Sequence, residues 1–152
     1  MSEEPSKERI EIEVPSKALY VQHAHCPKGC DLMEPGVKIG GYPSVRVRLR
    51  HRGKEGFIYL DPRYGSFENI SEIDVPDGEV VEFFCPHCGA SLKDEHARCK
   101  VCSAPMFALS LPRGGIIEGC LRKGCFEHVL RIVSGEELLS RLFESDTLSS
   151  YL

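Results

Sequence analysis

The sequence predicts a mainly β domain, of the β-rich α+β class, that ends in one helix. Several short segments alternate apolar and polar residues with the two-residue period of a half-buried strand. Turn signals that contain proline and glycine separate some of these segments. Only the C-terminal segment changes to a helical period. The chain has 152 residues, of which 41% are hydrophobic, and this is enough for one domain with a real core.

The strand signals begin after a charged segment, and we expect residues 1–9 to be a disordered lead-in to a single domain over 10–152. The longest signal is a hairpin over 44–61 with its turn inside 52–56. Alternation along its first strand places Val45, Val47 and Leu49 on one face. The other expected strands cover 10–14, 18–26, 79–84, 105–111 and 128–133.

The C-terminal segment carries both the start signal and the apolar stripe of a helix. Ser134 and Glu137 form a capping box. Apolar residues then recur at helical spacing, namely Leu138, Leu139, Leu142 and Phe143. We therefore expect a helix over about 135–146 whose stripe covers the core.

Composition argues against two classes of partner. The formal net charge of −4 gives no bulk attraction to phosphate or to anionic lipid, so binding of either needs a local patch. No apolar run approaches the roughly 18 residues that a membrane span needs. The polar N-terminus lacks the apolar stretch of a secretory signal. These observations predict a cytoplasmic protein with no membrane partner.

Eight cysteines fall into four close pairs, which are Cys26/Cys30, Cys85/Cys88, Cys99/Cys102 and Cys120/Cys125. In a reducing compartment such pairing indicates thiolate ligation of a metal rather than disulfides. This recurrence of pairs is the only repetition that we find, and the sequence shows no long internal repeat. The cysteines are therefore predicted to be metal ligands.

The two inner pairs stand in the segment CPHCGASLKDEHARCKVCSAP, residues 85–105, with ten residues between them. This segment resembles the short zinc-ribbon family, whose hairpin we expect over 83–108. The resemblance implies that one zinc ion is held by Cys85, Cys88, Cys99 and Cys102. Ser103 stands where the second knuckle of that family commonly has glycine, which implies a strained or different turn. His87 and His96 also lie in the segment, but four cysteines already fill a tetrahedron. A rubredoxin-like iron centre is the alternative, and the lack of an aromatic cluster between the pairs favours zinc.

The outer pairs leave three arrangements open. They can form a second site, nested outside the first, from Cys26, Cys30, Cys120 and Cys125. Alternatively, the four pairs can alternate in a cross-braced plan, or the outer cysteines can be free thiols. Nesting closes a loop of 89 residues rather than ten, which costs about 2 kcal/mol more. Since a structural zinc site contributes roughly 10 to 16 kcal/mol, we predict two zinc ions in nested sites.

Histidines and basic residues flank the outer pairs. Three histidines are placed to replace one thiolate ligand, namely His23, His25 and His128. Three basic residues are expected to offset part of the negative charge of a zinc ion with four thiolates, namely Lys28, Arg122 and Lys123.

The favoured function is that of a non-catalytic zinc-binding protein, because closed four-cysteine sites are structural. The sequence contains no HExxH motif, no glycine-rich phosphate loop and no hydrolase-type serine motif. The family that it resembles serves in transcription, in translation and as docking modules. We therefore expect a zinc-finger-like module that binds another protein within a larger assembly.

Two further functions stay open. The first is nucleic-acid binding through a basic segment that contains Arg46, Arg48, Arg50, Arg52 and Lys54. The first three of these arginines share one strand face, which equally suits an acidic protein partner or a solvent-facing strand. The second is a redox or metal-dependent enzyme that uses the outer cysteines.

Overall fold

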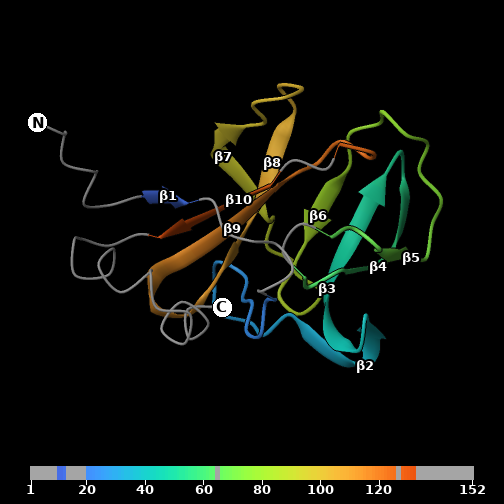
Figure 1. Ribbon diagram of the computed structural model, residues 1–152. Helices are drawn as coiled ribbons and strands as arrows, with labels where there is room; N and C mark the ends of the chain where they lie inside the picture. Colours follow the sequence, from blue (N-terminus) through green and yellow to red (C-terminus); the bar gives the residue numbers. More distant parts are fainter. Residues whose placement is uncertain (1–9, 13–19, 64–65, 126–127, 133–152) are drawn as a thin grey trace, which may run out of the picture.

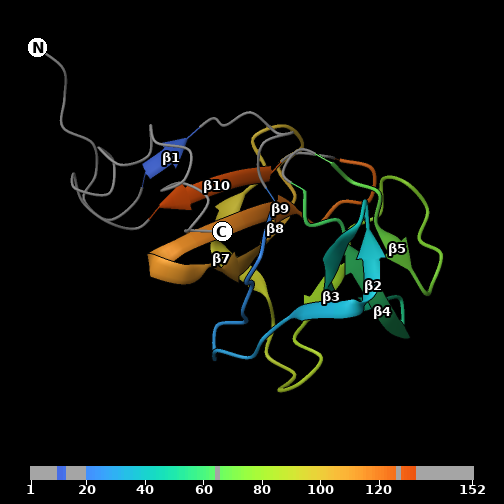
Figure 2. The same ribbon diagram turned by 60° about the horizontal axis from the view of Figure 1, so that its bottom comes forward.

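The computed structural model describes residues 10–12, 20–63, 66–125 and 128–132. These residues form two antiparallel sheets, which lie side by side in Figures 1 and 2. Apart from one 3-10 turn at Pro112–Gly114, the regular elements in the described ranges are strands. The predicted mainly β class is therefore confirmed for this part of the chain.

The first sheet is built around the long strand β3 (Tyr42–His51). Its first half pairs with β2 (Met33–Ile39) and its second half with β6 (Glu82–Phe84) on the same edge. The other edge of β3 pairs with β4 (Lys54–Leu60), which in turn pairs with β5 (Ile70–Ser71).

The predicted β3–β4 hairpin is confirmed together with its alternation. Val45, Val47 and Leu49 are buried, whereas the arginines between them point to the opposite face. Register pairs His51 with Lys54, so the turn consists of Arg52 and Gly53. Both turn residues have positive φ, as a tight hairpin turn of the primed type requires.

The second sheet has the order β1, β10, β9, β8, β7. Its strands, in that order, are Ile10–Ile12, His128–Ile132, Gly115–Cys120, Pro105–Ser110 and Lys93–Arg98. The β7–β8 hairpin carries the third cysteine pair at its tip, and β9 ends at the start of the fourth.

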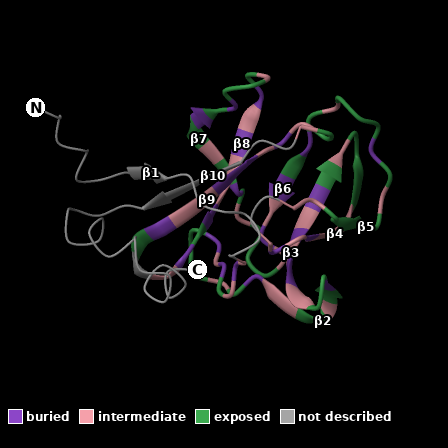
Figure 3. Cartoon of the chain, in the orientation of Figure 1, coloured by how far each residue is buried: buried purple, intermediate pink, exposed green. Residues whose placement is uncertain are grey.

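One hydrophobic cluster contains buried residues from both sheets, and buried segments, drawn in purple, occur in the strands of both sheets in Figure 3. Leu32 and Leu92, each only 1% exposed, lie just before β2 and β7 and belong to this cluster. The rings of Phe83 and Phe107, one from each sheet, lie with centroids 5.0 Å apart. Cys26, Cys30 and Cys85 belong to this cluster or pack against it, whereas the third and fourth cysteine pairs lie in a second cluster with Ala97 and Met106.

The sequence prediction differs from the structure at five strands. The expected strand over 18–26 is wrong within the described residues, because Tyr20 and His25 form only isolated bridges there. Strands β2 and β7 were not predicted, since the segments MEPGVKI and KDEHAR lack strand alternation. The two-residue strand β5 and the strand β9, which follows a turn signal, were not predicted either. The expected lead-in over 1–9 and the helix over about 135–146 lie outside the described residues. No helix in the described ranges is long and apolar enough to cross a membrane.

Candidate metal centres

The eight cysteines come together in two groups of four. Site 1 consists of Cys26, Cys30, Cys85 and Cys88, and site 2 consists of Cys99, Cys102, Cys120 and Cys125. Within each group all four sulfur atoms lie within 4.8 Å of one another. Four sulfurs about 2.3 Å from a tetrahedral ion are about 3.8 Å apart. Three sulfur pairs lie near this spacing, at 3.8 Å for Cys26 and Cys88, 3.7 Å for Cys99 and Cys125 and 3.4 Å for Cys102 and Cys120.

This grouping corrects the predicted pairing of the cysteines. The nested arrangement is wrong, because the second pair joins the first pair and the third pair joins the fourth. The cross-braced plan is equally excluded, and none of the eight cysteines stands alone. The cause is β7, whose six residues are extended and span about 20 Å at about 3.3 Å per residue. Cys88 and Cys99 therefore lie beyond opposite ends of one strand.

Site 1 is made of two knuckles whose backbone amides point at sulfur. Cys26 Sγ accepts hydrogen bonds from the N–H groups of Lys28 and Cys30 at 3.3 and 3.4 Å. Cys85 Sγ accepts from His87 N–H at 3.3 Å in the same way. Gly29 has a φ of 95°, which lets the first knuckle turn back within five residues. Such amides stabilise thiolates, so the backbone favours the charge state in which cysteine binds metal.

Site 2 repeats this arrangement at the tip of the β7–β8 hairpin. Cys99 Sγ accepts from Val101 N–H, and Cys120 Sγ accepts from Arg122 N–H, both at 3.4 Å. Ser103 has a φ of 67°, a left-handed conformation that costs a non-glycine residue free energy. The strained turn expected at Ser103 is therefore confirmed.

The electrostatics of both sites favour the binding of a cation. In site 1, burial raises the pKa of Cys26, but the amides of Cys30 and Lys28 outweigh this and lower it to about 7. The pKa of its neighbour Cys30 is raised to about 12, first by its hydrogen bond with Cys26. In site 2, the Ala104 amide and the Arg122 guanidinium lower the pKa of Cys102 to about 6. Four neighbouring thiols cannot all ionise unless a positive ion offsets their mutual repulsion. Zn²⁺ and iron both suit four thiolates.

Arg122 is the basic residue that serves site 2 directly. Its side chain donates to Cys102, and its Nη1 donates to Gly78 O at 2.8 Å. Lys123 Nζ instead donates to Val75 O and to Asp77, both at 3.2 Å. In site 1 the corresponding residue, Lys28, is exposed. Of the three expected basic neighbours, Arg122 has the contact that offsets thiolate charge.

Replacing Arg122 by methionine is expected to weaken metal binding at site 2 by about 10- to 100-fold, the usual effect of removing a supporting partner. Competition with a chromophoric chelator measures this affinity, with site 1 removed by Cys26→Ser so that only one site reports. Lys28→Met, in a protein that lacks site 2 through Cys120→Ser, is the matched control and should change affinity less than threefold. Equal effects of the two substitutions would contradict the role of Arg122.

Acid is expected to release metal from both sites, because protons compete with metal for thiolates. In each site one thiol has a lowered pKa and its neighbour a raised one, namely Cys26 with Cys30 and Cys102 with Cys120, so both sites should release metal over a similar pH range. An indicator dye measures release during acid titration of Cys26→Ser and of Cys120→Ser, each of which keeps one intact site. Retention of metal in strong acid by either variant would contradict ligation by thiolates.

The described histidines do not belong to either group. His25 pairs with Ser110 through the backbone, and His87 and His96 are exposed. The proposed replacement of a thiolate by His23 or His25 is therefore not what the structure shows, because both groups already contain four sulfurs. The side chain of His128 lies outside the described part of the molecule.

The outer face of the first sheet carries the predicted basic segment. We call it the arginine face, and it consists of Arg46, Arg48, Arg50, Phe57 and Phe84. Arg46 and Arg48 lie over the Phe57 ring at 4.8 and 5.5 Å, and Arg50 lies over Phe84 at 4.5 Å. The sequence did not show which rings share this face, and Phe84 was missed because it belongs to a distant strand.

Acidic side chains already pair with this arginine face. Glu55 contacts Arg48 at 3.4 Å and Arg50 at 3.3 Å. Glu34 contacts Arg46 at 3.8 Å. The other two predicted basic residues lie at the hairpin turn, where Arg52 pairs with Glu79 at 2.9 Å and Lys54 is exposed. The face is therefore amphipathic and carries both signs of charge.

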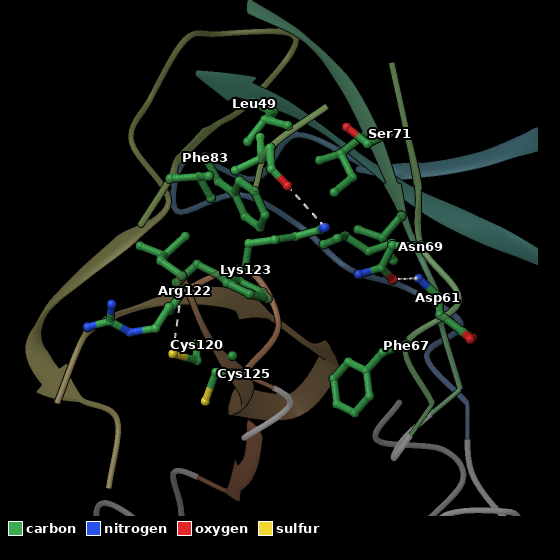
Figure 4. A pocket seen from close by; sticks show the side chains of 18 of the residues that line it. Leu49, Asp61, Phe67, Asn69, Ser71, Phe83, Cys120, Arg122, Lys123 and Cys125 are labelled. Atoms are coloured by element: carbon green, nitrogen blue, oxygen red, sulfur yellow. Dashed lines mark hydrogen bonds between the residues drawn. The ribbon is translucent and has the colours of Figure 1, made fainter. Parts of the chain in front are cut away.

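A cavity of about 590 Å³ lies between the sheets and reaches site 2. In Figure 4 the sulfurs of Cys120 and Cys125 lie at the lower left, Phe67 lies at the lower right, and Lys123 extends across the view above them. Two of its charged groups are engaged within the protein, since Lys123 holds the loop at Val75 and Asp61 holds Arg63.

Comparison of the chain with models of known families, with characterised proteins and with solved structures gives no match. The function is therefore inferred from the geometry of the sites.

Proposed function

We propose that this protein is a non-catalytic zinc-binding protein whose two four-cysteine sites are structural, and that it acts as a protein-interaction or accessory module of a larger assembly. The observation that supports this most is the division of all eight cysteines into two groups of four. Four thiolates complete a tetrahedron and leave no position for substrate or water, which distinguishes structural from catalytic zinc sites. An enzyme that uses the outer cysteines is less favoured, because each outer pair shares its group with an inner pair.

Zinc is the metal that we propose for both sites. The two knuckles of the segment 85–105 have the amide-to-sulfur bonds and tight turns that the zinc-ribbon resemblance implies, although they serve different sites. The proposed location is a reducing compartment such as the cytoplasm, where close pairs of thiols stay reduced and available to bind metal.

Metal analysis combined with X-ray absorption spectroscopy tests the structural assignment. The reduced protein should contain two zinc ions per chain, each with four sulfur neighbours. One zinc per chain, or an average coordination with nitrogen or oxygen in place of a sulfur, would contradict closed four-cysteine sites. Iron in place of zinc would overturn the choice of metal and leave the structural role intact.

The arginine face is the surface that we propose for the protein partner. Arginine and aromatic residues are enriched at protein interfaces, and here they lie together on exposed strands. A phosphate backbone would have to compete with Glu34 and Glu55 for the arginines. This pairing favours a partner that carries both signs of charge, such as another protein, over nucleic acid.

Nucleic-acid binding stays the second candidate because stacked arginine and phenylalanine side chains also suit single-stranded bases. Substituting Ser for Arg46, Arg48 and Arg50 should leave the fold intact, since these side chains point away from the core. Binding of single-stranded DNA and RNA is then measured against salt for both proteins. Tight binding by the parent, with a steep salt dependence that the triple variant loses, would favour nucleic acid over the protein partner.

A further inference from the structure

The chain contains two stretches whose backbones are held by the same pattern of hydrogen bonds. In residues 20–63, Val21 N donates to Pro62 O at 2.7 Å. In residues 80–122, Val81 N donates to Leu121 O at 2.9 Å. One residue before each donor, an isolated bridge pairs Tyr20 with Arg63 and Val80 with Arg122. We call residues 20–63 the first unit and residues 80–122 the second unit.

The correspondence continues through the first knuckle of each unit. Leu32 N donates to Ala24 O, and its counterpart Leu92 N donates to Phe83 O. The following strands then repeat the same register. Met33 pairs with Val45 in β2–β3, as Lys93 pairs with Phe107 in β7–β8. The next pair is Glu34 with Ser44 in one hairpin and Asp94 with Met106 in the other, and in both hairpins a register shift follows it. The two hairpins point to opposite ends of the molecule in Figure 1.

The two units also pair with each other reciprocally. Phe84, just before the knuckle of the second unit, belongs to β6 and pairs with Arg48 on β3 of the first unit. His25, just before the knuckle of the first unit, forms an isolated bridge with Ser110 on β8 of the second unit. Equivalent positions of each unit therefore contact equivalent positions of the other, as in an isologous contact between two copies related by a twofold axis.

Site 1 lies across this contact. Its first two ligands come from the knuckle of the first unit and its other two from the equivalent knuckle of the second. A metal ion there is bonded to both units. Site 2 differs, because its four ligands come from the second unit and its continuation to Cys125.

The first unit has an ion pair where the second unit has site 2. Register aligns Leu60 with Gly119, so Asp61 corresponds to Cys120 and Arg63 to Arg122. The Asp61 side chain is fully buried and accepts from Arg63 Nε at 3.0 Å and from Arg63 Nη2 at 2.9 Å. The Arg63 guanidinium lies against the hairpin tip, where a Cβ on Gly40 would be 2.5 Å from Arg63 Cζ. Arg122 contacts Cys102 at the equivalent tip.

We propose that the two units are copies of one metal-binding module, that the metal of site 1 joins them, and that the Asp61–Arg63 pair closes the first hairpin as the metal of site 2 closes the second. The proposal rests on metal binding by the cysteines, which is part of the proposed function. In this proposal each unit binds the other unit, through the contact that site 1 joins. Two identical copies would have one shared site and one site at each hairpin tip, which makes three. The ion pair takes the place of the metal at the first tip, so the chain has two four-cysteine sites.

A nicked form of the full chain tests this proposal. A protease recognition sequence is inserted between Ile73 and Asp74, which lie outside any strand and between the two units. After cleavage of the folded, zinc-loaded protein, the fragments should remain associated. Cys26→Ser should raise the dissociation constant of the fragments at least about 100-fold, since a structural zinc site contributes far more than this. Cys120→Ser, which removes a ligand within one fragment, should raise it less than about threefold.

Metal content, measured on every sample, separates the possible failures. Nicked parent protein without metal would overturn the proposed function together with this inference. Two bound metals in the nicked parent, with equal dissociation constants for Cys26→Ser and Cys120→Ser, would overturn the joining role of site 1 alone. If Cys26→Ser fails to fold because Cys26 is buried, Cys88→Ser removes an exposed ligand of the same site and gives the same comparison.

Discussion

Removal of both metals with a strong chelator is expected to unfold the described β structure at room temperature. A structural zinc site contributes roughly 10 to 16 kcal/mol of apparent binding free energy in small domains. The whole stability of a domain is commonly about 5 to 15 kcal/mol. Both sites also join separate segments, since 54 residues lie between the two pairs of site 1 and 17 residues between the two pairs of site 2. Circular dichroism and thermal denaturation of the metal-free, reduced protein measure the loss of structure.

Adding back zinc should restore the folded signal, whereas magnesium should not, because it prefers oxygen ligands. Metal-free protein must be kept reduced during this experiment, since neighbouring thiols oxidise to disulfides that would mimic the metal. A metal-free, reduced protein with an unchanged melting temperature would show that the hydrophobic core suffices and that the sites are not structural.

The second large effect is expected at the ion pair of the first unit. Replacing Arg63 by methionine leaves the fully buried Asp61 carboxylate without its charged partner. Breaking a buried pair in this way costs about 3 to 5 kcal/mol of unfolding free energy. Asp61 keeps its bonds from Ser66 Oγ and Glu68 N, so the lower end of this range is expected. Urea denaturation of zinc-loaded protein measures the change.

Arg52→Met is the matched control for Arg63→Met. Arg52 also forms an ion pair, with Glu79 at 2.9 Å, but its side chain is 75% exposed. An exposed pair contributes about 0 to 1 kcal/mol, so this substitution should have little effect. Equal losses of stability in the two variants would contradict the structural role assigned to Arg63.

The pH dependence gives an independent check of the same pair. Burial raises the pKa of Asp61, but hydrogen bonds from Arg63 and Ser66 outweigh it and hold the pKa below its usual value. A carboxyl group whose pKa is lowered on folding stabilises the protein above its unfolded pKa of about 3.9. That contribution is lost as the pH falls through the folded pKa. The stability difference between the parent and Arg63→Met should therefore shrink in acid.

Local sequence pattern was enough to predict those parts of the fold whose residues alternate or pair along the chain. The β3–β4 hairpin was predicted because Val45, Val47 and Leu49 alternate with arginines and a glycine stands at the turn. The cysteines were predicted to be ligands because close pairs of thiols have few other uses in a reducing compartment. Their grouping was not predictable from spacing, since that depends on whether the ten residues between the inner pairs turn or extend. In the structure β7 makes them extend.

The relation between the two units was hidden for a different reason. Their shared hydrogen bonds involve backbone atoms, which leave little trace in side-chain identity. Cys26-Pro27 and Cys85-Pro86 match, as do Leu32 and Leu92, but the distance along the chain between counterparts changes by one to three residues from place to place. Arg63 and Arg122 occupy equivalent positions in the two units, but this equivalence became visible only from their bridges to Tyr20 and Val80.

The grouping of the cysteines is tested most directly by the metal content of two double variants. Cys26→Ser/Cys85→Ser removes two ligands of site 1 and should leave one zinc per chain in site 2. Cys85→Ser/Cys99→Ser removes one ligand from each site and should weaken or abolish both. Mass spectrometry under native conditions counts the bound ions. If Cys85→Ser/Cys99→Ser keeps one tightly bound zinc while Cys26→Ser/Cys85→Ser loses both, the cysteines are nested and the grouping described above is wrong.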